Sequence, residues 1–299
     1  MSATPKARLQ ATDRGRAERS RPTGDDLTRQ LRPPSRTPER RFQVIGHRGA
    51  AGHAPENTAP AFEIAVALGV HAVELDVRLS RDGVPVVIHD STVDRTTNGK
   101  GAVAELRLAE LKELDAGGWW APDFAKTRLL TLEEALDVIA GRVPVVVEIK
   151  EEDRLARLFE VCRGLFSGAA PGSIVFSSFS LETLIAAAEA LPDVPREWLL
   201  RRGGYSCDGA LALAREAPVA RICPPAAEVD AAWVAAASEA GLGVRAWGIP
   251  SAQTGPMVQA MRKVVRSGAA GATADFPDVL LSTLKALACE PSKDTGAAG

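Results

Sequence analysis

Hydrophobic and polar positions alternate strictly in the segment VELDV at residues 73–77. In an extended strand its three apolar side chains share one face, and Glu74 and Asp76 share the other. Two carboxylates on one face of an apolar strand repel each other unless a cation lies between them, and hard divalent cations take oxygen ligands. Taken alone, the pattern is also typical of a solvated edge strand.

A second apolar segment follows closely. Arg81-Asp82-Gly83 is a turn signal, and the run VPVVI at residues 84–88 ends in His89 and Asp90. The short turn brings the end of this run back beside residues 73–77. We therefore expect a strand over 84–89 that extends the sheet locally and does not count among the main strands.

The same kind of strand recurs at residues 142–150, RVPVVVEIK. Its alternate apolar residues share one face, and Val146, Glu148 and Lys150 share the other. From this point strands and helices alternate regularly, which predicts a parallel sheet.

Eight such units over about 250 residues match the α/β architecture of a (β/α)8 TIM barrel. The strands are expected near Val44, Val73, Val145, Ile174, Trp198, Ala220, Val244 and Ala272, and the helices at about 61–68, 132–140, 153–166, 181–190, 209–216, 230–240, 256–267 and 277–288.

Residues 91–130 interrupt the alternation. This stretch has little strand character and one short helical pattern at 108–114. It is too long for a structureless loop inside a compact domain. We therefore predict a small insertion after the second strand region that forms a cap beside the active site.

Two helix starts have capping signals. Asn57 or Thr58 can cap the helix that begins near residue 61. Thr131 can cap the helix after the insertion, with Glu134 placed to complete a capping box.

Composition limits the class of protein. The chain has 299 residues, a formal net charge of -2 and 4 widely spaced Cys without a Cys-x-x-Cys pair. The charge gives no indication of a nucleic-acid binder, and the Cys pattern argues against a disulfide scaffold or a structural zinc site. No apolar run of about 18 residues and no signal-peptide core is present, so we expect no membrane span and a cytoplasmic location. The oligomeric state is left open.

The two ends of the chain differ from its middle. Residues 1–40 hold ten Lys and Arg against five Asp and Glu, with few large apolar residues. Such a segment cannot bury enough apolar surface to offset the entropy cost of ordering. We predict a disordered basic tail over 1–41, the barrel over 42–289 and a disordered tail over 290–299. Membrane or nucleic-acid binding by the basic tail is an alternative that its interleaved acids weaken.

Active sites of such barrels lie at the C-terminal ends of the strands. Glu74, Asp76 and Glu148 lie at two such ends and make an oxygen-rich site suited to Mg²⁺ or Ca²⁺. The alternative for Glu148 is a buried ion pair with Lys150.

Basic and titratable side chains lie at the same ends. Arg48 and Lys150 add positive charge that suits a phosphate group, since Arg binds phosphate oxygens bidentately and Lys acts as a point charge. His47 and His89 are able to exchange protons near neutral pH. A metal site, a phosphate grip and two His together indicate hydrolysis of a phosphate ester.

The chain resembles the glycerophosphodiester phosphodiesterase family over about residues 42–287. The motifs that carry the resemblance are Gly46-His47-Arg48-Gly49, Pro55-Glu56-Asn57-Thr58, Glu74-Leu75-Asp76-Val77, Asp82-Gly83, His89-Asp90, Asp94-Arg95-Thr96-Thr97 and Glu148-Ile149-Lys150. The family is a (β/α)8 barrel with an insertion after the His-Asp strand, as expected above.

The resemblance implies a role for each matching residue. His47 and His89 are the implied acid–base pair, without a decision on which is the acid, and Glu56, Asn57 and Asp90 are implied to support the site. The metal ligands are Glu74, Asp76 and Glu148, and the substrate-binding residues are Arg48, Lys150 and Trp247, although a core role for Trp247 is equally consistent with the sequence.

The C-terminal third departs from the family pattern. The stretch 268–271, GAAG, lacks an Asp that the family usually has, and Ala274-Asp275-Phe276-Pro277 has Ala where a Thr is usual. Trp247 is followed by Gly-Ile-Pro rather than Thr-Val-Asn. These changes bear on the preference for the alcohol group and leave the metal and His residues intact.

The implied reaction converts a glycerophosphodiester to sn-glycerol 3-phosphate and an alcohol, with Mg²⁺ or Ca²⁺ as cofactor. Attack by the glycerol 2-hydroxyl through a cyclic phosphate and direct attack by water both stay open. The alternatives are a lysophospholipase D or sphingomyelinase D type enzyme on lipid substrates, for which Trp119, Trp120 and Phe124 could line a groove, and a non-catalytic binding barrel.

Overall fold

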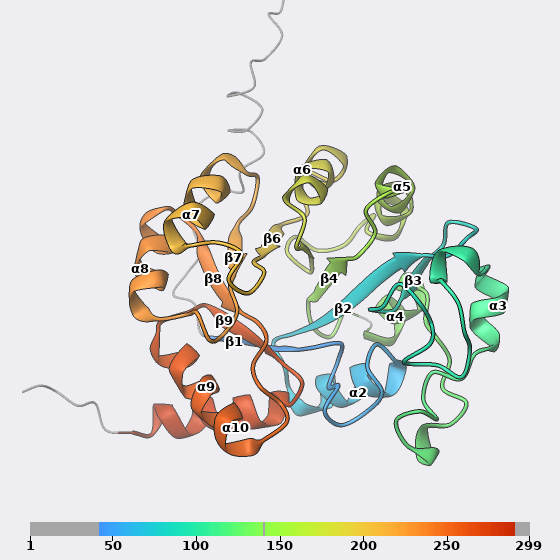
Figure 1. Ribbon diagram of the computed structural model, residues 1–299, viewed down its shortest axis with the longest axis horizontal. Coiled ribbons are helices and arrows are strands. Elements are labelled where there is room, and N and C mark those ends of the chain that lie inside the picture. Colours follow the sequence, from blue (N-terminus) through green and yellow to red (C-terminus); the bar gives the residue numbers. More distant parts are fainter. Residues whose placement is uncertain (1–41, 140, 291–299) are drawn as a thin grey trace, which may run out of the picture.

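Eight short parallel strands close into a barrel in the computed structural model, which describes residues 42–139 and 141–290 (Figure 1). The basic tail predicted over 1–41 and all but the first residue of the tail predicted over 290–299 lie outside the described residues. The predicted (β/α)8 architecture is confirmed.

The sheet order is β1-β9-β8-β7-β6-β5-β4-β2-β3, and an additional β1–β2 pairing closes the barrel. The short strand β3 pairs antiparallel with β2 and stays outside the barrel, as predicted for residues 84–89. The strands are β1 Gln43–Gly46, β2 Ala72–Leu79, β3 Pro85–Val87, β4 Val145–Ile149, β5 Ile174–Ser178, β6 Arg196–Leu199, β7 Arg221–Cys223, β8 Gly243–Ala246 and β9 Gly271–Ala274.

Helices surround the barrel and connect consecutive parallel strands (Figure 1). The helices are α2 Ala59–Leu68, α4 Leu132–Ile139, α5 Leu155–Leu165, α6 Leu181–Ala190, α7 Cys207–Glu216, α8 Ala231–Glu239, α9 Thr254–Arg266 and α10 Pro277–Ala288. Parallel strands need such crossovers because each strand must return to the same end of the sheet before the next begins.

The two faces of a barrel strand meet different surroundings. In β4, Val145, Val147 and Ile149 belong to the large core between the sheet and the helices, whereas Val146 packs with Ile45 inside the barrel. This is the division of faces predicted for residues 142–150. Full burial of a Val side chain stabilises the fold by about 1.5–3 kcal/mol, so a charge at position 147 would disrupt this layer.

The insertion predicted over 91–130 forms a subdomain at one side of the barrel (Figure 1). It contains α3 (Leu108–Glu113) and two 3₁₀ turns, η1 (Val103–Glu105) and η2 (Pro122–Phe124). Its own apolar cluster joins Val103, Leu111 and Leu129 to Val86 of β3. Because β3 is shared between the two, the subdomain is attached firmly to the barrel.

One predicted helix cap is confirmed and one is wrong. Thr131 and Glu134 form a reciprocal capping box at α4, with N–H to side-chain oxygen distances of 2.8 and 3.1 Å. At α2 no side chain caps the helix. The Thr58 hydroxyl donates to the Pro55 carbonyl instead, and the Asn57 amide donates to Asp76. The Asn57 side chain therefore supports the Asp76 carboxylate and does not cap α2.

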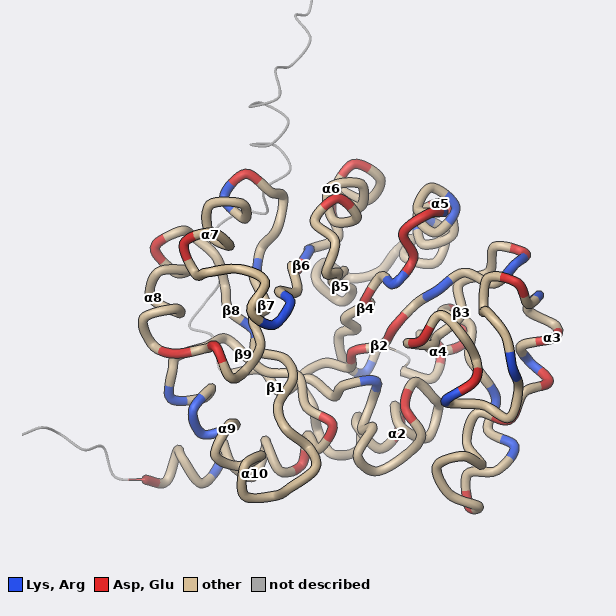
Figure 2. The backbone as a smooth tube through the Cα atoms, in the orientation of Figure 1, with Lys and Arg blue, Asp and Glu red and all other residues tan. Residues whose placement is uncertain are grey.

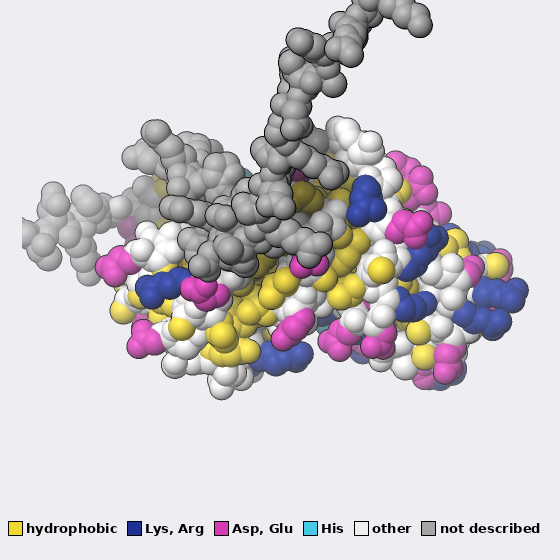
Figure 3. Space-filling view, turned by 90° about the horizontal axis from the view of Figure 1, so that it is seen from above, with side chains coloured by type: hydrophobic (Ala, Val, Ile, Leu, Met, Phe, Trp, Pro, Cys, Tyr) yellow, Lys and Arg dark blue, Asp and Glu magenta, His cyan; other side chains and the backbone are white. Residues whose placement is uncertain are grey.

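Charged residues are interspersed on the outer helices, while acidic positions also lie on β2 and β4 in the middle of the barrel (Figure 2). The coloured part of the face in Figure 3 likewise carries basic, acidic and hydrophobic side chains side by side. Among the described helices, none combines the length and apolar character needed to cross a bilayer.

Candidate active site

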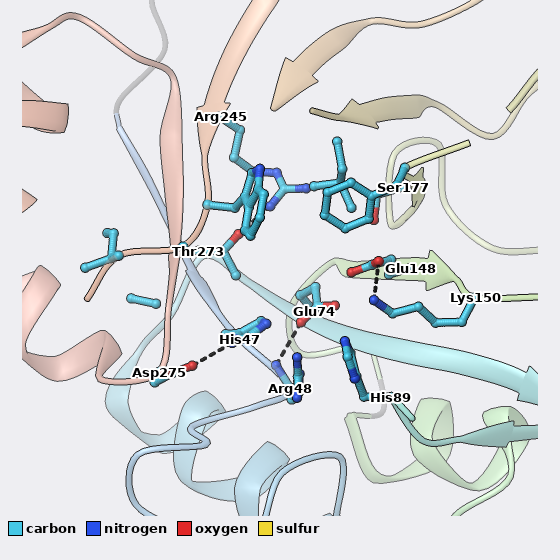
Figure 4. A pocket seen from close by; sticks show the side chains of 16 residues that line it. His47, Arg48, Glu74, His89, Glu148, Lys150, Ser177, Arg245, Thr273 and Asp275 are labelled. Carbon is cyan, nitrogen blue, oxygen red and sulfur yellow. Dashed lines mark hydrogen bonds and ion pairs between the residues drawn. The ribbon is translucent and has the colours of Figure 1, made fainter. Parts of the chain in front are cut away.

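A cavity of about 220 Å³ opens among the C-terminal ends of the barrel strands. Seven residues predicted for the site line it, namely His47, Arg48, Glu74, His89, Glu148, Lys150 and Trp247. Figure 4 shows the first six converging on this cavity from β1, β2, the segment after β3, and β4. Barrel closure therefore brings together residues from motifs that are far apart in the chain.

Three carboxylates form the centre of the site. Ligand oxygens of Glu74, Asp76 and Glu148 lie within 4.8 Å of one another, and all three residues are buried. Glu74 Oε1 has no hydrogen-bond partner among the described residues. A buried anionic oxygen without a partner is unfavourable unless a cation is near, and this donor set suits a hard divalent ion.

The protonation of the three acids reflects their crowding. Burial, followed by the charge of Asp76, raises the pKa of Glu148 to about 7. Burial and the charge of Asp76 also raise the pKa of Glu74. Burial alone would raise the pKa of Asp76, but Arg48 and Lys150 outweigh it and lower that pKa. A bound divalent cation would favour the ionised form of all three.

Arg48 and Lys150 surround the carboxylates on the cavity side. Lys150 Nζ lies 2.5 Å from Glu148 Oε1 and 3.4 Å from Asp76 Oδ1, so the ion pair proposed as an alternative for Glu148 exists within the candidate metal site. Arg48 Nε lies 3.2 Å from Asp76 Oδ2. Both basic side chains line the cavity, where they can bind a phosphate group.

The loop after β1 has an unusual backbone that positions its side chains. Arg48 has a φ of 49°, in the left-handed region, which non-Gly residues adopt at a cost of roughly 1–2 kcal/mol. Its N–H donates to Glu74 Oε2 at 2.8 Å. Gly49 has a φ of 87°, and a Cβ there would lie 2.6 Å from the Ala61 carbonyl carbon. The glycine therefore permits a turn that points Arg48 into the cavity.

His47 pairs with a residue that the sequence analysis did not select. Its Nδ1 lies 2.5 Å from Oδ1 of Asp275, which follows β9. Burial lowers the pKa of His47, but the hydrogen bond to Asp275 and the charge of Glu74 outweigh it, so the pKa is raised. A cation on Glu74 would cancel that second contribution, and Asp275 would then be the main group that keeps His47 protonated.

His89 pairs with its chain neighbour. Its Nδ1 lies 2.7 Å from Asp90 Oδ1, which leaves Nε2 for proton exchange with a substrate. Burial, together with Arg48 and Lys150, lowers the pKa of His89, although Asp76 and Asp90 oppose this. The two histidines are thus shifted in opposite directions.

Arg95 connects the two predicted supporting acids. Its guanidinium binds both oxygens of Asp90 and both oxygens of Glu56, at donor–acceptor distances from 2.7 to 3.1 Å. Glu56 in turn accepts a hydrogen bond of 2.6 Å from Arg48 Nη1. One Arg in the insertion therefore reaches His89 through Asp90 and Arg48 through Glu56.

Aromatic side chains form one wall of the cavity. Trp247 and Phe179 both line it and pack edge to face, with ring centroids 5.2 Å apart. Trp247 Nε1 donates to the Leu200 carbonyl at 3.1 Å. Trp247 therefore lies on the cavity side of the barrel, as expected for a residue of the substrate pocket rather than of the core. Trp119, Trp120 and Phe124, considered for a lipid groove, do not line the described cavity.

Comparison with known proteins agrees with this site. The glycerophosphoryl diester phosphodiesterase family matches the chain over residues 47–279. The chain belongs to this family. It is 34% identical to the Bacillus subtilis protein YhdW, named as a candidate glycerophosphodiester phosphodiesterase, over 80% of this chain and 96% of that protein.

Solved structures show the same relationship. An Oleispira antarctica phosphodiesterase in complex with the product sn-glycerol-3-phosphate has a TM-score of 0.73 and 30% identity, and the match covers 81% of this chain and 96% of that one. A glycerophosphodiester phosphodiesterase from Agrobacterium tumefaciens has a TM-score of 0.69 and 30% identity, over 81% and 100% of the two chains. The chain is thus a glycerophosphodiester phosphodiesterase in fold and enzyme class.

Several residues that lie at this site were not predicted as site residues from the sequence. Asp275 lay in a stretch noted for lacking a Thr, and Arg95 lay in a motif quoted only for the resemblance. Ser177, Phe179 and Arg245 also line the cavity. Ser177 and Arg245 alternate with outward-facing residues on predicted strands, so their inward position is a signal that the strand pattern contains.

Proposed function

We propose that this chain hydrolyses glycerophosphodiesters to sn-glycerol 3-phosphate and an alcohol, and that it needs a divalent cation. The observation that carries the proposal is the convergence of three buried carboxylates, two histidines with opposite pKa shifts and two basic side chains on one cavity. The relative with bound sn-glycerol-3-phosphate supports the same product here.

Glu74, Asp76 and Glu148 would hold Mg²⁺ or Ca²⁺, and a bound cation supplies positive charge that polarises the phosphodiester. Arg48 and Lys150 bind the phosphoryl oxygens and hold the phosphorus in place. Their charges also stabilise the negative charge that develops in the transition state.

His89 acts as the general base and His47 as the general acid. The lowered pKa of His89 leaves it neutral and able to accept the proton of the nucleophile through Nε2. The raised pKa of His47 favours its protonated form, which can protonate the leaving alkoxide. Asp90 and Asp275 orient the two rings through Nδ1.

The nucleophile is either the glycerol 2-hydroxyl, which gives a cyclic phosphate that water then opens, or water itself. Phosphorus NMR of the reaction distinguishes the two routes. A transient cyclic glycerophosphate signal indicates the first, and its absence at high enzyme concentration indicates the second.

Removal of metal tests the proposed cofactor. Chelator-treated protein should lose activity on glycerophosphocholine and regain it with Mg²⁺ or Ca²⁺. Glu148→Gln should weaken metal binding because it removes one anionic ligand, so more metal is needed to restore activity. Glu63→Gln is the control, since Glu63 is an exposed acid that pairs with Arg142 on the outer surface. Full activity in protein shown by elemental analysis to be metal-free would overturn the proposal.

A further inference from the structure

Charged residues occupy the β6–β9 half of the barrel interior, in addition to the three carboxylates on β2 and β4. On the β1–β5 side, Ile45 and Val146 belong to a small apolar cluster. On the β6–β9 side, Glu197, Arg245 and Thr273 are buried instead. Interiors of such barrels are usually filled by branched apolar side chains, so the charged half needs a functional or structural reason.

The charged half contains one carboxylate and two guanidinium groups. Glu197 is 1% exposed. Its Oε2 accepts from Arg245 Nε at 2.5 Å, and its Oε1 accepts from Arg221 Nη1. Glu197 thus pairs with both guanidinium groups, and the charge of Glu74 also acts on Arg245.

Two residues of this region that line the cavity each have one buried hydrogen-bonding group without a partner among the described residues. Arg245 Nη2 and Ser177 Oγ are buried and have no hydrogen-bond partner among the described residues. Both residues line the cavity, and they are 2% and 0% exposed. Arg245 Nη1 donates to Thr273 Oγ1, which fixes the guanidinium.

The position of these groups separates them from the proposed acid–base pair. Figure 4 shows Arg245 and Ser177 together on one side of the cavity, and His47 and His89 on the other, with Glu74 between them. Ser177 lies next to Glu148 across the β4–β5 pairing and next to Glu197 across the β5–β6 pairing. A group bound there would lie beside the metal site and away from the histidines.

We propose that Arg245 and Ser177 form a second anion-binding subsite. It receives a carboxylate or phosphate group carried on one of the substrate's alcohols, distinct from the phosphodiester held by Arg48 and Lys150. An anionic oxygen would accept hydrogen bonds from both unpartnered groups, and a guanidinium binds a carboxylate or phosphate oxygen more strongly than a neutral hydroxyl. This inference rests on the proposed function, since it concerns the substrate of the same cavity.

A matched pair of substrates tests the subsite. The sn-glycero-3-phospho esters of 3-hydroxypropanoate and 3-hydroxypropanamide have nearly the same size and differ in one charge. Release of sn-glycerol 3-phosphate gives kcat/KM for each ester with Mg²⁺ and with Ca²⁺. The wild-type enzyme should prefer the carboxylate ester at least tenfold, and an ester ending in a phosphate group should be preferred similarly over its neutral alcohol.

Variants locate the preference. Arg245→Met should bring the ratio of the two kcat/KM values to within threefold of one, and Ser177→Ala should lower it at least threefold. Arg221→Met is the matched control, because Arg221 pairs with the same Glu197 but does not line the cavity, and it should keep the wild-type ratio. If circular dichroism shows that Arg245→Met is unfolded, the wild-type ratio and Ser177→Ala decide the question alone.

The outcomes separate the two proposals. Equal wild-type rates on both esters, or the same ratio in wild type and Arg245→Met, would overturn the subsite and leave the proposed function standing. If the wild-type enzyme hydrolyses neither ester nor glycerophosphocholine, with Mg²⁺ or with Ca²⁺, the proposed function is overturned instead.

Discussion

At the scale of single residues, the site depends on pairs that tune the two histidines. His47 and Asp275 are 228 positions apart and 2.5 Å apart in space. His89 and Asp90 are neighbours in the chain. Each carboxylate holds one ring nitrogen and so determines which nitrogen faces the substrate. The same arrangement supports histidines in many metal and acid–base sites.

The pH dependence of catalysis follows from these pairs. As the proposed base, His89 must be neutral, so kcat/KM should fall as pH drops below its lowered pKa. As the proposed acid, His47 must be protonated, so kcat/KM should fall as pH rises above its raised pKa. The result is a bell-shaped profile. His47→Ala and His89→Ala should each lower kcat by about a hundredfold or more, whereas His53→Ala should not, since His53 pairs with Asp278 and does not line the cavity.

Asp275→Asn should move only the alkaline limb. The variant removes the negative charge of Asp275 and leaves a neutral, weaker acceptor for His47, so His47 loses its proton at lower pH and the alkaline limb shifts to lower pH. The acidic limb, set by His89, should stay in place. The measurement is kcat/KM against pH, with Asp278→Asn as the control. An alkaline limb at the wild-type position would show that His47 is not the acid.

At the scale of elements, the insertion is part of the site and more than a cover at the side of the barrel. Arg95 extends from it to Asp90, which follows β3, and to Glu56, which lies between β1 and α2. The segment that carries His89 and the loop that carries Arg48 are thereby held to each other.

Arg95→Met should lower kcat/KM by about ten- to a hundredfold, as is usual when a residue that orients a functional group is lost. Tm should change little, because the barrel core is unchanged and Arg95 is partly exposed. Lys100→Met is the control in the same insertion, since its ion pair with Asp94 is exposed and neither residue lines the cavity. A kcat/KM equal to wild type would mean that barrel and insertion are positioned without Arg95.

At the scale of the whole molecule, closure of the barrel is what assembles the site. β1 pairs with β2 on one side and with β9 on the other. His47, just after β1, therefore lies beside Asp275, just after β9. Both edges of β1 are therefore paired among the described residues.

A shortened chain that begins at Arg41 should keep the kcat/KM and Tm of the full chain. Residues 1–40 hold few large apolar side chains and cannot support a core of their own. Thermal unfolding and steady-state kinetics of the two proteins check this. A Tm lower by more than about 4 °C, the shift expected for a loss of roughly 1 kcal/mol in a domain of this size, would show that the tail packs on the barrel.

The sequence by itself determined the features that depend on local pattern. Alternation with a period of two placed Glu74, Asp76 and Glu148 on inward faces, because side chains on a strand alternate by geometry. Regular exchange of strand and helix determined the parallel barrel, and the barrel in turn determined which strand ends meet.

Only the tertiary structure decided which distant side chains touch. The partner of His47, the bridge through Arg95 and the Arg245 Nη2 without a partner among the described residues depend on closure, register and rotamer, none of which leaves a periodic signal in the chain. The same reason explains the wrong helix cap. The Asn57 side chain can either cap a helix or donate to a carboxylate, and in the folded barrel Asp76 lies where Asn57 can donate to it.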